Sequence, residues 1–336
     1  MPEASASVPT SAQELDDLPL PPDLSSVKGW FHPADQVLFD WFLNRQRDLE
    51  EPGDLLELGV YLGKSAIFMG DFLRPGETFT VCDLFDSPAP DDANSKEMNR
   101  SYATLTRRAF EANYRSFHDE LPAVVQAPSS GITAHVRADS CRFVHIDASH
   151  LYEHVHADIA AAQRLLRRDG IVVLDDFRAE HCPGVAAATW GAVATTGLKP
   201  LCITATKFYG TWGAYDAVHG ELKAFLEGRD DMWHGAEEVA GQPMIRISGG
   251  KARMPAHPVS RHASAVPGQA AGAEGAPGAA AAAGAERGKG AAQATAVQQP
   301  PGKPARRTGD NRRPKGRGLV SFLSRRFWPE ALSRPS

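Results

Sequence analysis

Short apolar runs alternate with longer segments of helical periodicity between residues 34 and 212, and this alternation constrains the fold most strongly. Helices are predicted at 34–49, 63–73, 94–118, 151–168 and 184–196, and strands at 55–60, 78–84, 123–126, 142–147 and 171–174. Strands that alternate with helices form a parallel sheet through right-handed crossovers. Segments 200–204 and 207–212 lie too close together for a helix between them, so they predict a hairpin with an antiparallel edge strand. The expected fold class is α/β.

The composition changes at residue 250, and this change divides the chain. Before it, aromatic and branched apolar residues are spread throughout, and the segment is long enough to bury a core. After it, Ala, Gly, Pro, Gln and Arg dominate, with almost no large apolar residue before Leu319. Such a stretch buries too little surface to offset its chain entropy. We therefore expect a flexible segment at 1–30, one domain at 31–250 and a disordered tail at 251–336.

The charge divides at the same position. Of the net charge of −5, residues 251–336 contribute +11, from 15 Lys+Arg and 4 Asp+Glu, and the first 250 residues contribute −16. An acidic domain argues against nucleic-acid binding there. The basic tail suits an anionic surface or partner, and residues 319–328 (LVSFLSRRFW) are predicted to form a short amphipathic helix.

The cysteines and the N-terminus favour a cytoplasmic protein. The 4 cysteines are widely spaced, without a C-x-x-C pair, which predicts neither a zinc knuckle nor a disulfide framework. Residues 1–24 lack the basic and apolar regions of a signal peptide, and no apolar run is long enough to span a membrane. The sequence leaves open whether the protein forms a homo-oligomer.

A glycine-containing loop follows the first predicted strand, with the sequence ELGVYLGKS at 57–65. In a doubly wound sheet the ligand binds at the carboxyl ends of the strands, which places this loop at the site. A phosphate-binding P-loop requires glycine where Leu58 stands, and a nicotinamide-binding loop requires it where Tyr61 stands. A plain tight turn is a further alternative.

The loop resembles motif I of the class I S-adenosylmethionine-dependent methyltransferases, in which an acid precedes the first glycine by two residues and a second glycine follows four residues later. Glu57, Gly59 and Gly63 stand at these positions, although many class I enzymes carry a third glycine where Tyr61 stands. The resemblance implies a Rossmann-like, doubly wound, mostly parallel seven-stranded sheet with an antiparallel edge strand. It also implies that Asp83 accepts hydrogen bonds from the cofactor ribose. The expected cofactor-binding residues are Glu57, Gly59, Val60, Tyr61, Gly63, Ser65, Asp83, Ser129 and Asp147.

Three acidic residues end neighbouring predicted strands. Asp147 ends the fourth strand, and Asp175 and Asp176 end the fifth, so all three are expected at the carboxyl edge of the sheet. Converging carboxylates repel unless a cation neutralises them, and oxygen ligands suit Mg²⁺. The pattern resembles metal-dependent O-methyltransferases of the catechol and macrocin types and implies an Mg²⁺ site. The alternative is that one of the pair merely caps the next helix.

A histidine-rich segment, HIDASHLYEHVH, occupies residues 145–156. Within it, His150, Glu153 and His154 match the H-x-x-E-H pattern of some metalloproteases, but the match opens a helix directly after a strand, so we interpret it as coincidence. His150 lies three residues after Asp147, where the resemblance to catechol-type enzymes places a lysine general base. Imidazole is an effective base near neutral pH. The alternative is that His150 packs at the helix start and bonds to backbone.

These expectations define a hypothesis for function. The resemblance implies methyl transfer from S-adenosylmethionine to a hydroxyl of a small-molecule acceptor (a sugar, polyketide or phenol), with His150 as base and Asp147, Asp175 and Asp176 holding the metal. A non-catalytic Rossmann-like binding module is the alternative from another class, and methyl transfer distinguishes the two.

Overall fold

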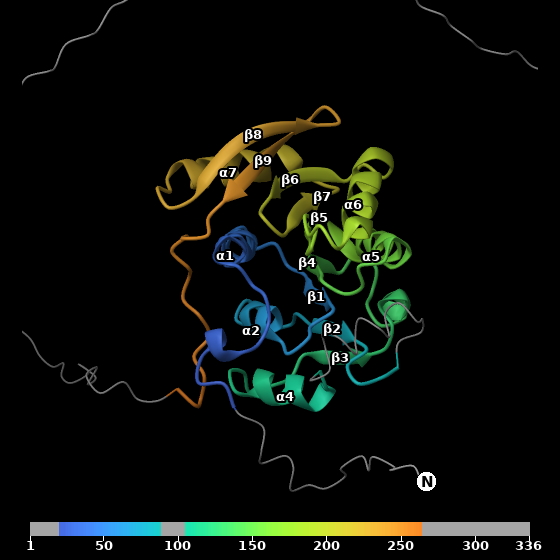
Figure 1. Ribbon diagram of the computed structural model, residues 1–336, viewed down its shortest axis with the longest axis vertical. Coiled ribbons are helices and arrows are strands. Elements are labelled where there is room, and N and C mark those ends of the chain that lie inside the picture. The colour runs from blue at the N-terminus through green and yellow to red at the C-terminus, as the bar shows by residue number, and fades with distance from the viewer. Residues whose placement is uncertain (1–19, 89–104, 264–336) are drawn as a thin grey trace, which may run out of the picture. The chain divides into compact units, whose positions relative to one another are not determined.

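The computed structural model describes residues 20–88 and 105–263 (Figure 1). Its helices are η2 (Leu24–Ser26), α1 (Pro33–Asp48), α2 (Lys64–Gly70), α4 (Arg107–Arg115), η3 (Ser129–Ala134), α5 (Tyr152–Leu165), α6 (Pro183–Thr195) and α7 (Tyr215–Glu227). Its strands are β1 (Asp54–Leu58), β2 (Phe79–Asp83), β3 (Ala123–Gln126), β4 (Cys141–Ile146), β5 (Leu166–Leu174), β6 (Lys199–Ile203), β7 (Phe208–Thr211), β8 (Trp233–Val239) and β9 (Gln242–Ser248). The predicted alternation is confirmed up to β7, and the part of the predicted 94–118 helix before Leu105 lies outside the described residues.

The strands form one sheet in the order β3-β2-β1-β4-β5-β7-β6-β9-β8. The first five are parallel, and β7 is antiparallel to both β5 and β6, which confirms the α/β class and the hairpin. The predicted count of seven strands is wrong, because α7 and the antiparallel pair β8–β9 extend the sheet to nine strands. The pair escaped prediction because β8 is an edge strand rich in exposed and half-buried polar residues, without a clear apolar alternation.

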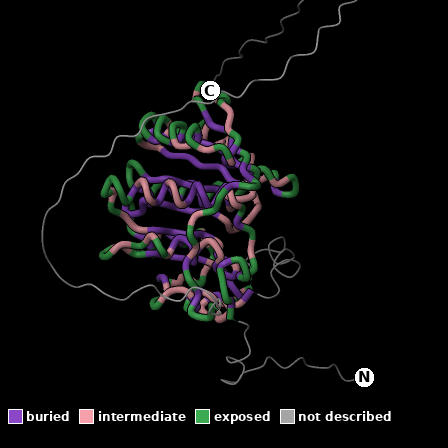
Figure 2. Tube along the Cα trace, turned by 90° about the vertical axis from the view of Figure 1, so that its left-hand side faces the viewer, coloured by how far each residue is buried: buried purple, intermediate pink, exposed green. Residues whose placement is uncertain are grey.

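Two layers of helices cover the two faces of the sheet. Alternate residues of each strand point to opposite faces, so Leu55 and Val173 pack with α1, α2, α4 and α7, whereas Leu56 and Val172 pack with η3, α5 and α6. Figure 2 shows the buried strands running through the interior and exposed residues on the outer helix surfaces. Chain order reverses between β1 and β4, so the carboxyl ends of these strands meet at the switch point of the sheet.

Two segments outside the predicted 31–250 domain contact it. Leu24 and Val27 are buried in the core, and the hydroxyl of Ser260 donates to the carbonyl of Pro21 at 2.6 Å. The backbone N–H of Arg261 donates to the carbonyl of Ser116. The residues described at both ends therefore pack on the domain, while the basic tail from 264 onward, including the predicted 319–328 helix, lies outside the described residues. In the described part, no helix combines the length and apolarity that a membrane crossing requires.

Candidate active site

The carboxyl ends of β1, β2, β4 and β5 open into a cavity of about 1150 Å³. Its volume exceeds that of a typical single small-molecule site, so it has room for two ligands. One end is lined by the loop after β1, the end of β2 and the start of η3, including Ser129, and the other by the segments that follow β4 and β5. Of the predicted site residues, the cavity lining contains Gly59, Val60, Tyr61, Ser65, Asp83, Ser129, Asp147, His150, Asp175 and Asp176.

The glycine loop is held in a conformation that its sequence explains. Gly59 has φ 79°, and a Cβ there would collide with the carbonyl of Asp147 on the neighbouring strand. Tyr61 also adopts a left-handed backbone, with φ 48°. This is the position at which many class I enzymes carry glycine, so the tyrosine keeps the backbone conformation at some cost in strain. Its ring stacks on Trp30, with centroids 6.0 Å apart.

Asp83 fixes this loop from the end of β2. One carboxylate oxygen accepts the backbone N–H groups of Val60 at 2.8 Å and Tyr61 at 3.1 Å, and the other accepts that of Phe85 at 2.7 Å. Burial raises the pKa of Asp83, and the backbone donors oppose this rise. Asp83 therefore orders the loop directly, a role that the ribose prediction did not include.

The lysine of the loop faces the N-terminal segment. Lys64 Nζ donates to the carbonyls of Gly29 at 3.2 Å and Ser25 at 3.4 Å. In a P-loop this ammonium would be directed at phosphates. Its two carbonyl partners, together with Leu58 at the position of the required glycine, argue against a P-loop.

A buried polar chain runs beneath the cavity from the glycine loop to the acidic edge. Glu57 Oε1 accepts the hydroxyl of Ser65 at 2.5 Å and lies 2.7 Å from Nδ1 of His145. Nε2 of His145 lies 3.0 Å from Nζ of Lys207. Burial raises the pKa of Glu57 to about 8, and burial together with Lys207 lowers the pKa of His145 well below its ordinary value. A neutral imidazole that donates from Nδ1 and accepts at Nε2 satisfies both neighbours.

Lys207 also forms an ion pair with Asp175, which sequence analysis had assigned to a metal. Burial alone would raise the pKa of Asp175, but the ammonium lowers it below its ordinary value. Burial and the neighbouring Asp175 carboxylate raise the pKa of Asp147 well above its ordinary value. The charge of Asp175 is therefore balanced by Lys207.

The three acids of the predicted Mg²⁺ site fall into two groups of possible ligand atoms. Among the described residues, the groups of three whose ligand atoms lie within 4.8 Å of one another are His145, Asp147 and Asp175, and separately His150, Asp176 and Cys182. Both oxygens of Asp175 have donors, one in Lys207 and the other in the backbone N–H of Asp176 at 2.8 Å. The Mg²⁺ site therefore stays a prediction, and in this structure Asp175 is paired with the buried ammonium of Lys207.

His150 and Asp176 form the other ionisable pair of the cavity. Nε2 of His150 lies 2.9 Å from Asp176 Oδ2, and the pair is partly exposed. Burial would raise the pKa of Asp176, but His150 lowers it below its ordinary value. His150 precedes α5, whereas His154 lies in its first turn and contacts Ser149, so the H-x-x-E-H match does not form a metal site of the described residues.

Sequence reasoning missed several residues of this site. His145 was noted only as part of the histidine-rich run, and Lys207 was not singled out at all. A lysine within the apolar run of 201–209 was a usable signal, because a buried ammonium requires a carboxylate partner. Other residues of the cavity lining that sequence analysis did not assign are Lys28, Trp30, His32, His181 and Thr206.

Comparison with known proteins finds similarity to methyltransferases in the central part of the chain. Residues 56–177 match the family model of a methyltransferase domain. Similar solved structures include the O-methyltransferase NovP, at 19% identity over 53% of this chain and 79% of that one, with a TM-score of 0.46. The methyltransferase PaMTH1 of Podospora anserina, bound to SAH, is 14% identical over 63% of this chain and 100% of that one, with a TM-score of 0.40. MycE from mycinamycin biosynthesis, in complex with Mg, SAH and mycinamycin VI, is 17% identical over 58% of this chain and 56% of that one, with a TM-score of 0.35. No curated protein matches the sequence.

Proposed function

We propose that this chain, in which residues 56–177 match a methyltransferase domain, transfers a methyl group from S-adenosylmethionine to a hydroxyl oxygen of a small molecule. The observation that carries the proposal is the His150–Asp176 pair in the lining of the cavity, which the glycine loop also lines. A hydroxyl must lose its proton as its oxygen attacks, so this reaction needs a base, and imidazole titrates near neutral pH. A sugar, polyketide or phenol would supply such a hydroxyl.

The residues at the loop end of the cavity fit S-adenosylmethionine. Glu57 Oε2 is buried and has no hydrogen-bond partner among the described residues, which suits an amino group nearby or bound through water. Ser129 and Asp83 also line the cavity and provide polar atoms for the cofactor. When bound, the cofactor supplies an electrophilic methyl group on its sulfonium.

The chain itself contributes alignment and proton removal. The cavity holds the acceptor beside the cofactor, and fixing two reactants in line accounts for much of the rate in such transfers. His150 accepts the hydroxyl proton, while Asp176, 2.9 Å from Nε2 of the ring, orients the imidazole and stabilises the imidazolium that forms. No step of this proposal passes through a metal.

The direct test is formation of S-adenosylhomocysteine with a panel of acceptors. The panel pairs phenols and sugar glycosides with analogues in which the hydroxyl is replaced by an amine or hydrogen. We expect turnover with hydroxyl compounds and none with the analogues that lack the hydroxyl. Cofactor binding without turnover across the panel would favour the non-catalytic binding module, and methylation of the amines alone would overturn the proposed oxygen nucleophile.

Replacing Asp83 with alanine should weaken S-adenosylmethionine binding by more than about tenfold, because each lost charged hydrogen bond contributes roughly 1.5–3 kcal/mol and two such bonds order the glycine loop. Isothermal titration calorimetry measures the affinity directly. Asp86→Ala, three residues along the same loop, is the matched control and should bind like the wild type. Equal affinity in Asp83→Ala and wild type would contradict the assignment of the cofactor end.

A further inference from the structure

Lys207 is a fully charged side chain in the interior of the domain. Only 1% of its side chain is exposed, and its ammonium forms an ion pair with Asp175 and lies 3.0 Å from Nε2 of His145. The rings of Phe31 and Phe39 complete its surroundings, each with its centroid 6.0 Å from Nζ. Among the described residues, Asp175 is therefore the ion-pair partner of this buried ammonium.

The backbone of Lys207 is fixed by the turn that joins β6 to β7. Its N–H donates to the hydroxyl of Thr204 at 2.9 Å, and its carbonyl accepts the N–H of Thr204 at 2.9 Å. Asp35 of α1 anchors the same turn by accepting the hydroxyls of Thr204 at 2.8 Å, Thr206 at 3.0 Å and Tyr209 at 2.7 Å. This bracing holds a normally flexible side chain at one place under the acidic edge.

The Lys207 ammonium lies where the acidic edge needs a positive charge, next to the carboxylate of Asp175. Asp175 and Asp147 belong to one cluster and both line the cavity, whereas Lys207, which is outside the lining, pairs with Asp175. The remaining carboxylate, that of Asp176, pairs with His150. A dication bound by Asp175 would compete with the Lys207 ammonium for the same carboxylate, and the two cations would repel each other in a weakly screened interior.

The geometry points to Lys207 as an internal counter-cation that takes the place of a divalent metal at the acidic edge, so that the acceptor site works without Mg²⁺. Lys207 is a positioning residue, because it acts through Asp175 and does not line the cavity. The inference deepens the proposed function, but its central prediction concerns metal binding and is measurable without any acceptor.

The first experiment uses the full-length wild type and Mn²⁺ as a spectroscopic probe for a hard divalent site. Electron paramagnetic resonance with S-adenosylhomocysteine present should show no stoichiometric Mn²⁺ bound by the protein at concentrations up to about 1 mM, a range in which weak oxygen-ligand sites still bind. Turnover with any active acceptor should be unchanged after chelation. A stoichiometric Mn²⁺ site that Asp147→Asn removes would overturn the inference, whether or not methyl transfer is found.

The second experiment removes the ammonium. Lys207→Met keeps the volume but leaves Asp175 and Asp147 unneutralised, and it should bind Mn²⁺ at least about a hundredfold more tightly than the wild type, since Coulomb repulsion from a nearby buried charge is lost. Lys207→Met/Asp175→Asn removes both charges of the pair and should return Mn²⁺ binding to the wild-type level. Lys199→Met, on the adjacent strand with its ammonium on the carbonyl of Gly213, is the control and should not change Mn²⁺ binding.

These variants separate a counter-cation from a merely structural lysine. A structural lysine would lower the melting temperature without creating metal affinity, so a folded Lys207→Met that binds no more Mn²⁺ than Lys199→Met would contradict the inference. If Lys207→Met does not fold, the wild-type Mn²⁺ measurement still tests the inference, because a stoichiometric Mn²⁺ site would contradict it. If no acceptor is turned over at all while the metal results hold, the proposed function fails and the inference about Lys207 stands.

Discussion

Replacing His150 with alanine should lower kcat for methyl transfer by about 10²–10⁴-fold, the usual contribution of a general base, with little change in the affinity for S-adenosylmethionine. We expect kcat to fall without a loss of cofactor affinity because the two sites are formed by different segments. His150 and Asp176 follow β4 and β5, whereas the predicted cofactor-binding loop follows β1. Single-turnover kinetics measure the chemical step, and calorimetry measures cofactor binding.

Two further variants make this result specific. Asp176→Asn keeps the shape of the side chain but removes the charge that orients and stabilises His150, so it should lower kcat by less than His150→Ala. His135→Ala replaces an exposed histidine outside the cavity lining and should retain wild-type kcat. If His150→Ala kept the wild-type kcat, the base would have to be another group of the cavity, such as His181, or the acceptor would need none.

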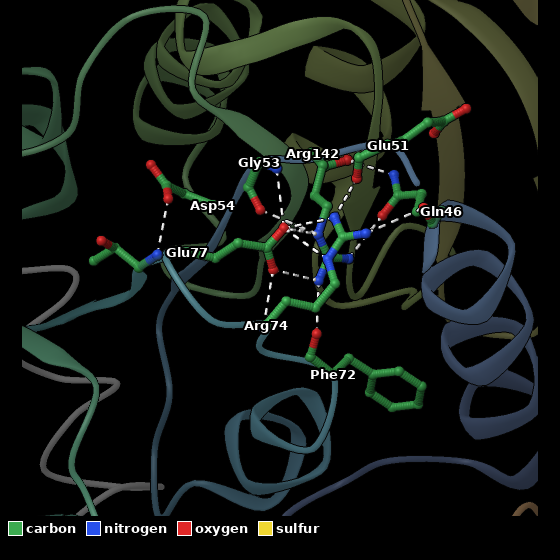
Figure 3. A network of polar contacts seen from close by, with 9 residues as sticks. Gln46, Glu51, Gly53, Asp54, Phe72, Arg74, Glu77 and Arg142 are labelled. Carbon is green, nitrogen blue, oxygen red and sulfur yellow. Dashed lines mark hydrogen bonds and ion pairs between the residues drawn. The ribbon is translucent and has the colours of Figure 1, made fainter. Parts of the chain in front are cut away.

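Replacing Glu77 with alanine should destabilise the fold by about 3–5 kcal/mol, because it leaves a buried guanidinium without its partner. Glu77 Oε2 accepts Nη2 of Arg142 at 3.0 Å, and the two side chains are only 7% and 2% exposed (Figure 3). Oε1 also accepts Nε of Arg142 at 3.1 Å, Nε of Arg74 at 2.9 Å and the N–H of Gly53 at 3.0 Å. Arg142 further donates to Gln46 and to the carbonyl of Phe72, so this network joins α1, β2 and β4 at the end of the sheet opposite the cavity.

The same network predicts a dependence on pH. Burial would raise the pKa of Glu77, but Arg142 and Arg74 lower it below the ordinary 4.5. A depressed folded-state pKa contributes stability that is fully present above the unfolded value and is lost as pH falls through the folded value. The stability difference between wild type and Glu77→Ala, measured by urea denaturation, should therefore be full above pH 5 and shrink as the pH falls below about 4.5.

A surface pair supplies the control for this prediction. Glu111 pairs with Arg107 on α4 at 2.7 Å with both side chains partly exposed, so Glu111→Ala should cost less than about 1 kcal/mol. A loss in Glu77→Ala no larger than that in Glu111→Ala would show that the Arg142 guanidinium finds other partners or water when its carboxylate is removed.

The sheet could be predicted from the sequence up to β7 because strand apolarity and helix periodicity agree there. Apolar strands such as β4, with the sequence CRFVHI, are flanked by helices of clear periodicity, and Gly59 can adopt the φ of 79° that the first crossover needs. The signals fail at the far edge, where β8 (WHGAEEV) pairs only with β9 and shows no apolar face. Such a strand is defined by its partner and not by its own pattern.

For the candidate site, the sequence predicted which residues lie at the carboxyl edge of the sheet but not which side chains they contact. The loop after β1 and the ends of β2, β4 and β5 must converge in this topology, so Asp83, Asp147 and His150 could be placed at one edge. Their partners could not be predicted, because Lys207 reaches the acids from the turn between β6 and β7, 32 residues beyond Asp175. The hydrogen bonds from the loop to Asp83 likewise depend on side-chain directions that spacing does not encode.

The measurement that tests the central claim most directly is transfer of a labelled methyl group. The full-length protein is incubated with S-adenosylmethionine carrying ¹³C at the methyl carbon and with the hydroxyl acceptors of the panel, and the product is examined by carbon NMR. The account predicts a labelled methyl ether, formed by the wild type and reduced by about 10²–10⁴-fold in rate with His150→Ala. A labelled methyl group on nitrogen or carbon, or wild-type and His150→Ala proteins that form the ether at equal rates, would contradict it.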